Sequence, residues 1–83
     1  MNPVLADVVG LVGSALMVVA YAYSNMTRAL DFRLFNILNL VGSLLLIASL
    51  AVHFNLASMA LEVVWAAIAA LGLVKAFRKP AAR

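Results

Sequence analysis

The chain has no cysteine and only one histidine, and these absences exclude several functions. Without thiols it can form no disulfide, carry out no thiol redox chemistry and offer no thiolate to a metal ion. His53 has no second histidine or cysteine with which to complete a zinc site, so we expect no metal. The sequence also contains no Ser-His-Asp or Cys-His arrangement, no phosphate-binding glycine loop and no carboxylate pair at a workable spacing. We therefore expect no enzyme activity and no cofactor.

Charge is scarce as well. Charged residues make up 11% of the 83 residues and hydrophobic residues 67%, which is far outside the range of soluble domains. So short a chain could not hide that much apolar surface in a compact core, so the composition predicts an integral membrane protein embedded in the lipid bilayer. The formal net charge of +3 comes from a few flanking residues. They form no face broad enough to follow phosphates, so we expect no nucleic-acid partner.

Three apolar stretches dominate the chain, and each approaches the roughly 20 residues that a spanning helix needs. They cover about residues 4–23, 34–51 and 56–77. The first lacks a preceding basic region and is too long for a typical signal peptide. Asn2 and Pro3 suit the cap and first turn of its helix. The sequence predicts an all-α fold, a three-helix transmembrane bundle forming one domain, in which the short 53–55 link makes the second and third helices antiparallel neighbours.

The basic residues predict the orientation. If the chain crosses the membrane three times, the 24–33 connection and the basic tail, 78–83, lie on one side. All the cations then fall on that side: Arg28, Arg33, Lys75, Arg78, Lys79 and Arg83. Loops and tails that carry Lys and Arg usually lie on the cytoplasmic side of a membrane. We therefore expect a bacterial inner-membrane protein with its N-terminus outside and its C-terminus cytoplasmic. The cations can serve only as topology signals and head-group anchors, or they can also bind an acidic partner or lipid.

Polar and small residues within the spans recur at spacings of three and four, which places them on one face of each helix. These stripes are Asp7, Gly10, Ser14, Met17 and Tyr21; Asn36, Asn39 and Ser43; and Ser58, Glu62, Trp65, Ala69 and Gly72. Small residues let membrane helices approach closely, and serine or asparagine can bond across the contact. The stripes therefore predict helix contacts, with the opposite faces left to lipid.

Glu62 is the strongest candidate for a functional residue. It lies within the longest apolar run and is the only charged residue in that run before Lys75. Ionisable residues at such depth are rare and usually face a partner or a watery cavity. A carboxyl group there needs a proton, a cation or several donors. Glu62 is thus either a group that binds a solute, a proton or a partner, or a structural hydrogen-bonded carboxylic acid.

Four other side chains complete the predicted substrate-binding set. We expect Asn39, Ser43 and Tyr21 to line the same space as Glu62, with Trp65 as its wall rather than as a donor to it. For Asn39, a purely structural hydrogen bond to a neighbouring helix is equally compatible with the sequence.

Two polar residues near the outer end have simpler interpretations. Asp7 lies in the first turns of a helix, where negative charge is favoured by the helix dipole. His53 follows the second span near the predicted interface, where an imidazole can stay partly hydrated.

Several motifs suggest relatives. Gly10-x-x-Gly13 and Ala20-Tyr21 precede Asn39-x-x-Gly42-Ser43, and Leu61-Glu62-x-x-Trp65 comes last. This order resembles an uncharacterised family of small three-span bacterial membrane proteins with A-Y, N-x-x-G and E-x-x-W elements, and the resemblance covers nearly the whole chain.

More distantly, the layout is similar to the three-helix half-transporter unit of the SemiSWEET and PQ-loop group. The resemblance implies a pore made by two copies, with an asparagine early in the third helix contacting substrate. Glu62 would occupy the region of that asparagine, and Ala20-Tyr21 the region of the Pro-Gln hinge. The chain lacks that proline and has a carboxylate in place of the amide, so sugar transport does not carry over.

Together these features predict a transporter-like module that binds or moves a small solute through a homodimeric bundle. One subunit brings too few polar groups together to enclose a pathway, so the polar faces should pair with another copy or dock on a larger membrane protein. The alternatives are a non-catalytic accessory or structural subunit of a larger membrane complex, and a lipid-binding or purely structural peptide.

Overall fold

The computed structural model of the chain describes residues 1–78 and contains three long helices. They are α1 (Pro3–Met26), α2 (Phe32–Leu50) and α3 (Leu56–Arg78). Each is long and apolar enough to cross a membrane, which confirms the predicted all-helical fold and supports a multi-pass membrane protein. The predicted basic tail lies outside the described residues except for Arg78.

Side-chain caps fix where the helices begin. The Asn2 side chain accepts a hydrogen bond from the Leu5 amide at 2.7 Å, and Pro3 occupies the first helical turn, as the sequence predicted. Asp31 accepts from the Arg33 and Leu34 amides, so α2 begins at Phe32, two residues before the apolar run. Asn55 accepts from the Ser58 amide at 3.0 Å at the start of α3. All three caps are short polar side chains that satisfy otherwise unpaired amides.

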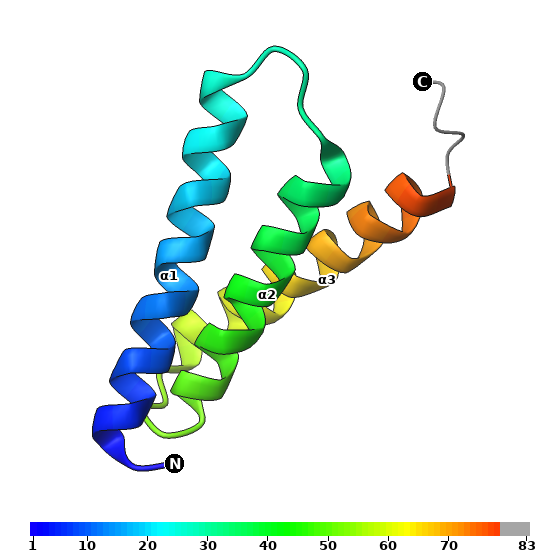
Figure 1. The fold of residues 1–83 in the computed structure, drawn as a ribbon. Helices are drawn as coiled ribbons and strands as arrows, with labels where there is room; N and C mark the ends of the chain where they lie inside the picture. The colour runs from blue at the N-terminus through cyan, green and yellow to red at the C-terminus, as the bar shows by residue number, and fades with distance from the viewer. Residues whose placement is uncertain (79–83) are drawn as a thin grey trace.

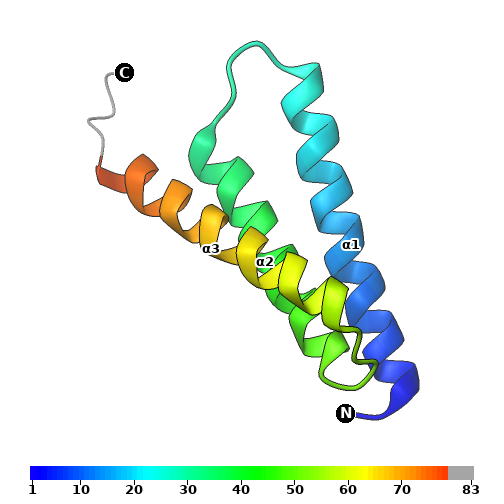
Figure 2. The same ribbon diagram turned by 180° about the vertical axis from the view of Figure 1, so that it is seen from behind.

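α2 is the central helix of the bundle. Figures 1 and 2 show α1 and α2 running side by side in opposite directions, while α3 crosses α2 and diverges from α1 toward its C-terminal end. Within the described part of the chain, α2 packs on both α1 and α3, whereas α1 and α3 do not pack on each other. The N-terminus lies at the end of the bundle that carries the link between α2 and α3 (Figure 1).

Glycines bring α1 and α2 into backbone contact. A Cβ atom added to Gly13 would lie 2.6 Å from the Gly42 carbonyl oxygen, and one added to Gly42 would lie 2.8 Å from the Gly13 carbonyl oxygen. Gly10 also packs closely on α2, but against a side chain, that of Ser49. Membrane helices associate through such close packing because lipid supplies no hydrophobic driving force between them.

The contact face of α1 differs in part from the predicted stripe. Its buried residues are Ala6, Gly10, Gly13 and Ala20. Gly10 was predicted, but Asp7 and Tyr21 at the ends of the stripe are exposed. The prediction treated α1 as covered along its whole length, whereas within residues 1–78 α1 packs on α2 and not on α3.

Candidate functional site

The polar residues of α2 form a buried row along the helix. Asn36, Asn39 and Ser43 are all buried, at spacings of three and four residues that place them on one side of α2. Each faces a residue of α3: Gly72 would clash with Asn36 if it had a side chain, Trp65 bonds to Asn39, and Glu62 lies beside Ser43. The predicted polar face of α2 is therefore the surface on which α3 packs.

Glu62 is buried between α2 and α3, with 9% of its surface exposed. It lies six residues into α3, or about 9 Å from the start of the helix at 1.5 Å per residue. Its Oε1 atom has no hydrogen-bond partner among the described residues. A buried carboxyl oxygen that lacks a partner is costly, so it is the feature of this site that most needs a ligand or a proton.

Ser43 joins all three helices. It is the largest fully buried side chain, and its hydroxyl group lies beside both the Glu62 carboxyl group on α3 and the Met17 sulfur on α1. The hydrogen bond to Met17 Sδ is long, at 3.9 Å, and sulfur is a weak acceptor. Because a hydroxyl hydrogen rotates freely, Ser43 can donate to Glu62 instead and satisfy one carboxyl oxygen.

Asn39 and Trp65 form a polar contact between α2 and α3 one helical turn from Glu62. Trp65 Nε1 donates to Asn39 Oδ1 at 3.0 Å, and Asn39 Nδ2 donates to the Phe35 carbonyl at 3.0 Å. Trp65 is therefore a hydrogen-bond donor, but to Asn39 rather than to Glu62. The bond fixes the orientation of the Asn39 amide and holds the indole against α2.

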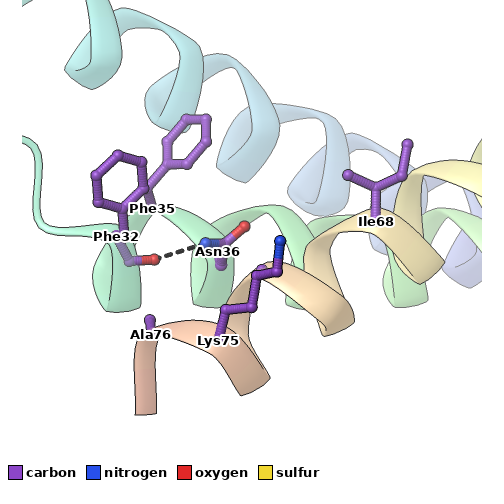
Figure 3. A pocket seen from close by; sticks show the side chains of 7 residues that line it. Phe32, Phe35, Asn36, Ile68, Lys75 and Ala76 are labelled. Carbon is purple, nitrogen blue, oxygen red and sulfur yellow. Dashed lines mark hydrogen bonds between the residues drawn. The ribbon is translucent and has the colours of Figure 1, made fainter. Parts of the chain in front are cut away.

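A groove continues from this pair toward the start of α2 and the end of α3, and we call it the α2–α3 groove. It has two parts, of about 350 and 230 Å³, which share Phe35, Asn36 and Ile68 as lining residues. The larger part reaches Lys75, and the smaller part reaches Asn39 and Trp65. Figure 3 shows Asn36 and Lys75 extending from the two helices into the larger part.

The structure brings four of the five predicted substrate-binding residues together. Glu62 and Ser43 are adjacent, and Asn39 and Trp65 bond to each other one turn away. Tyr21 is not with them: it is 72% exposed and lies near the end of α1, on which α3 does not pack in the described part of the chain. Within one chain, Tyr21 therefore lines no space shared with Glu62.

Two residues outside the predicted set belong to the same region. Asn36 lies on the α2 row and lines both parts of the groove, and its Nδ2 donates to the Phe32 carbonyl at 2.8 Å. Met17 approaches Ser43 from α1. Both lay on the predicted stripes, so the spacing signal was present, but nothing in the sequence distinguished them from packing residues.

Contacts between side chains also connect the helices at the two ends of the bundle. At one end, His53 Nε2 lies 3.1 Å from Asp7 Oδ1 and 3.2 Å from the Pro3 carbonyl oxygen, which connects the start of α1 to the link after α2. At the other end, the Arg33 guanidinium lies 4.6 Å from the centre of the Phe77 ring, which connects the start of α2 to the end of α3. In residues 1–78, no group of three or more His, Cys, Asp or Glu side chains could hold a metal ion.

Comparison with known proteins assigns the family. A family model matches residues 6–80, nearly the whole chain. The chain belongs to this family. The family is uncharacterised, which confirms the coarser part of the predicted resemblance. No curated protein and no solved structure matches the chain, so the comparisons give no support to a relation with the SemiSWEET and PQ-loop group.

Proposed function

We propose that this family member is a transporter-like module of the bacterial inner membrane, in which a homodimer binds and moves a small solute at Glu62. The solute is cationic, protonatable or hydrogen-bonding, because a carboxyl group, a hydroxyl group and an amide surround the site. The module has no enzyme activity. Its N-terminus lies outside and its C-terminus in the cytoplasm, since the cations of residues 1–78 lie in the α1–α2 connection, at the start of α2 and at the end of α3, away from the N-terminus.

The observation that carries the proposal is the unpartnered Oε1 atom of the buried Glu62. A purely structural carboxylic acid in lipid would be expected to donate its proton to a nearby acceptor and to receive hydrogen bonds on its other oxygen. In Glu62, by contrast, the Ser43 hydroxyl group lies beside the carboxyl group, and Oε1 has no hydrogen-bond partner within residues 1–78. The carboxyl group of Glu62 can therefore still bind a transported proton or an ammonium-type cation. Binding of protons or ions is the usual role of carboxyl groups within a membrane.

The open shape of one subunit supports the homodimer. Since α1 and α3 contact α2 but not each other within residues 1–78, one chain surrounds no continuous pathway. A second copy related by a twofold axis would add three helices and a second Glu62. The open arrangement is also compatible with the alternative that the protein is an accessory subunit. In that case, another protein of the larger membrane complex would cover the exposed sides of α3.

Flux measurements with purified protein in liposomes test the proposal. Proton entry can be followed with a pH-sensitive dye trapped inside, under an imposed membrane potential, and methylammonium uptake can be followed as a small-cation probe. We expect wild-type protein to carry one of these above the rate of protein-free liposomes, and both Glu62→Ala and Glu62→Gln to lose that flux. Asp7→Asn is the matched control, because it makes the same carboxylate-to-amide change at an exposed position.

The outcomes separate the hypotheses. Equal flux through wild type and Glu62→Gln, or no flux through wild type, contradicts the transporter proposal. Purification in mild detergent then distinguishes the remaining possibilities: a symmetric dimer supports the proposed assembly, whereas a stoichiometric larger partner supports the accessory subunit.

A further inference from the structure

The α2–α3 groove combines apolar walls with a cation at one end. Phe32, Phe35 and Ile68 supply apolar surface, and Lys75 reaches the groove from the last turns of α3 (Figure 3). The Lys75 ammonium group forms no ion pair with a carboxylate within residues 1–78. A site of this kind fits a molecule with an anionic head and an apolar tail.

The surrounding charges point the same way. Arg33 and Arg78 lie at the same end of the bundle as Lys75, at the start of α2 and the end of α3. Of the three acidic residues in the chain, only Asp31 lies at this end, and its side chain accepts hydrogen bonds from backbone amides at the start of α2. The mouth of the groove is therefore positive, which favours anionic lipid head groups.

The length of the groove matches one leaflet of a bilayer. Lys75 and Trp65, which line its two ends, are ten residues apart on α3, or about 15 Å at 1.5 Å per residue. This is half of the ~30 Å hydrocarbon thickness of a bilayer. A lipid with its phosphate at Lys75 would extend an acyl chain along Ile68 to the indole of Trp65.

From these observations we propose that the α2–α3 groove binds one anionic phospholipid of the surrounding bilayer. Its phosphate pairs with Lys75, and one acyl chain lies between α2 and α3 with its end near Trp65. The site is distinct from Glu62, which lies beyond the Asn39–Trp65 bond, and the proposal does not depend on transport.

Trp65 provides the assay, because it is the only tryptophan in the chain. Bromine atoms on an acyl chain quench tryptophan fluorescence on contact. The protein is reconstituted in vesicles with brominated phosphatidylglycerol in a phosphatidylcholine background, or with brominated phosphatidylcholine in a phosphatidylglycerol background. Comparison of the quenching in the two titrations gives the relative affinity of anionic and zwitterionic lipid for the site beside Trp65.

We expect wild-type protein to prefer the anionic lipid, and Lys75→Ala to lower this preference about fivefold, the contribution of one basic residue near a membrane surface. Arg28→Ala is the matched control: it removes the same charge from the 27–31 connection, outside the groove, and should leave the preference unchanged. Absence of any preference in wild type, or an equal loss in the two variants, would overturn the proposal.

A second variant tests the position of the tail. Ala76 lines the larger part of the groove, so Ala76→Leu narrows it while keeping Lys75. We expect less quenching by brominated phosphatidylglycerol in this variant, with unchanged helix content by circular dichroism. Quenching equal to wild type would show that the acyl chain does not occupy the groove.

Discussion

Substitution of Gly13 by alanine tests the glycine contact between α1 and α2. The new Cβ atom would lie 2.6 Å from the Gly42 carbonyl oxygen and 2.9 Å from Leu45 Cβ, whereas ordinary contacts begin at 3.4 Å. Neither atom can rotate away, so the two helices must separate by about 0.8 Å in a densely packed interface. Overpacking of this kind costs about 1–3 kcal/mol, and the better helix propensity of alanine offsets up to ~1 kcal/mol of it.

We therefore expect Gly13→Ala to lower the free energy of unfolding by about 1–2 kcal/mol. Gly10→Ala is the matched control on the same helix. Its Cβ would meet the Ser49 hydroxyl group at 2.7 Å, which can rotate, and Ser49 Cβ at 3.1 Å, so only a few tenths of an ångström of movement remain. Its overpacking cost should be largely cancelled by helix propensity, leaving a change near zero.

The assay uses the absence of native cysteine. Cysteines introduced at the exposed residues Val4 and Val52 can carry a donor and an acceptor dye, and energy transfer between them follows the separation of α1 from the end of α2 during reversible SDS titration. The reasoning is refuted if Gly13→Ala is as stable as the parent protein, or if Gly10→Ala loses as much stability as Gly13→Ala.

Two further contacts can be measured by double-mutant cycles in the same titration. For the Asn39–Trp65 hydrogen bond, the cycle with Asn39→Ala and Trp65→Phe should give a coupling energy of about 0.6 kcal/mol, the average for bonds between membrane helices, and no more than about 1.7 kcal/mol. A coupling near zero would show that the bond does not form. For the cation–π contact, the cycle with Arg33→Ala and Phe77→Leu should give about 0.5–1 kcal/mol, because both groups are exposed; a coupling that vanishes would place the end of α3 away from α2.

The helices were predictable because lipid requires long apolar segments with satisfied backbones. All three begin and end within three residues of the predicted ranges. α2 begins two residues before its predicted range because Asp31 caps it. The predicted range was based on the apolar run, which does not include the capping residue. The burial of Glu62 and Ser43 also followed from helical spacing, because both residues lie on the predicted contact stripes. That the two side chains are adjacent depends on the register of α3 against α2.

The residues at the ends of the stripes could not be placed in this way. Tyr21 shares a helical face with Gly10, but α3 diverges from α1, so no third helix covers it. The bond between Trp65 and Asn39 depends on the register of α3 against α2, which the spacing within each helix leaves undetermined. The pair between Asp7 and His53 likewise joins residues 46 positions apart through the packing of α1 on α2.

The arrangement of α1 and α3 on separate sides of α2 has a consequence for motion. We expect that α3 can change its tilt without disturbing the Gly13–Gly42 contact, because among residues 1–78 it packs on α2 and not on α1. The contacts that resist this movement are the Asn39–Trp65 hydrogen bond, the close packing of Gly72 on Asn36, and the Arg33–Phe77 cation–π contact. We therefore expect α1 and α2 to move as one unit, and α3, which carries Glu62, to move against that unit.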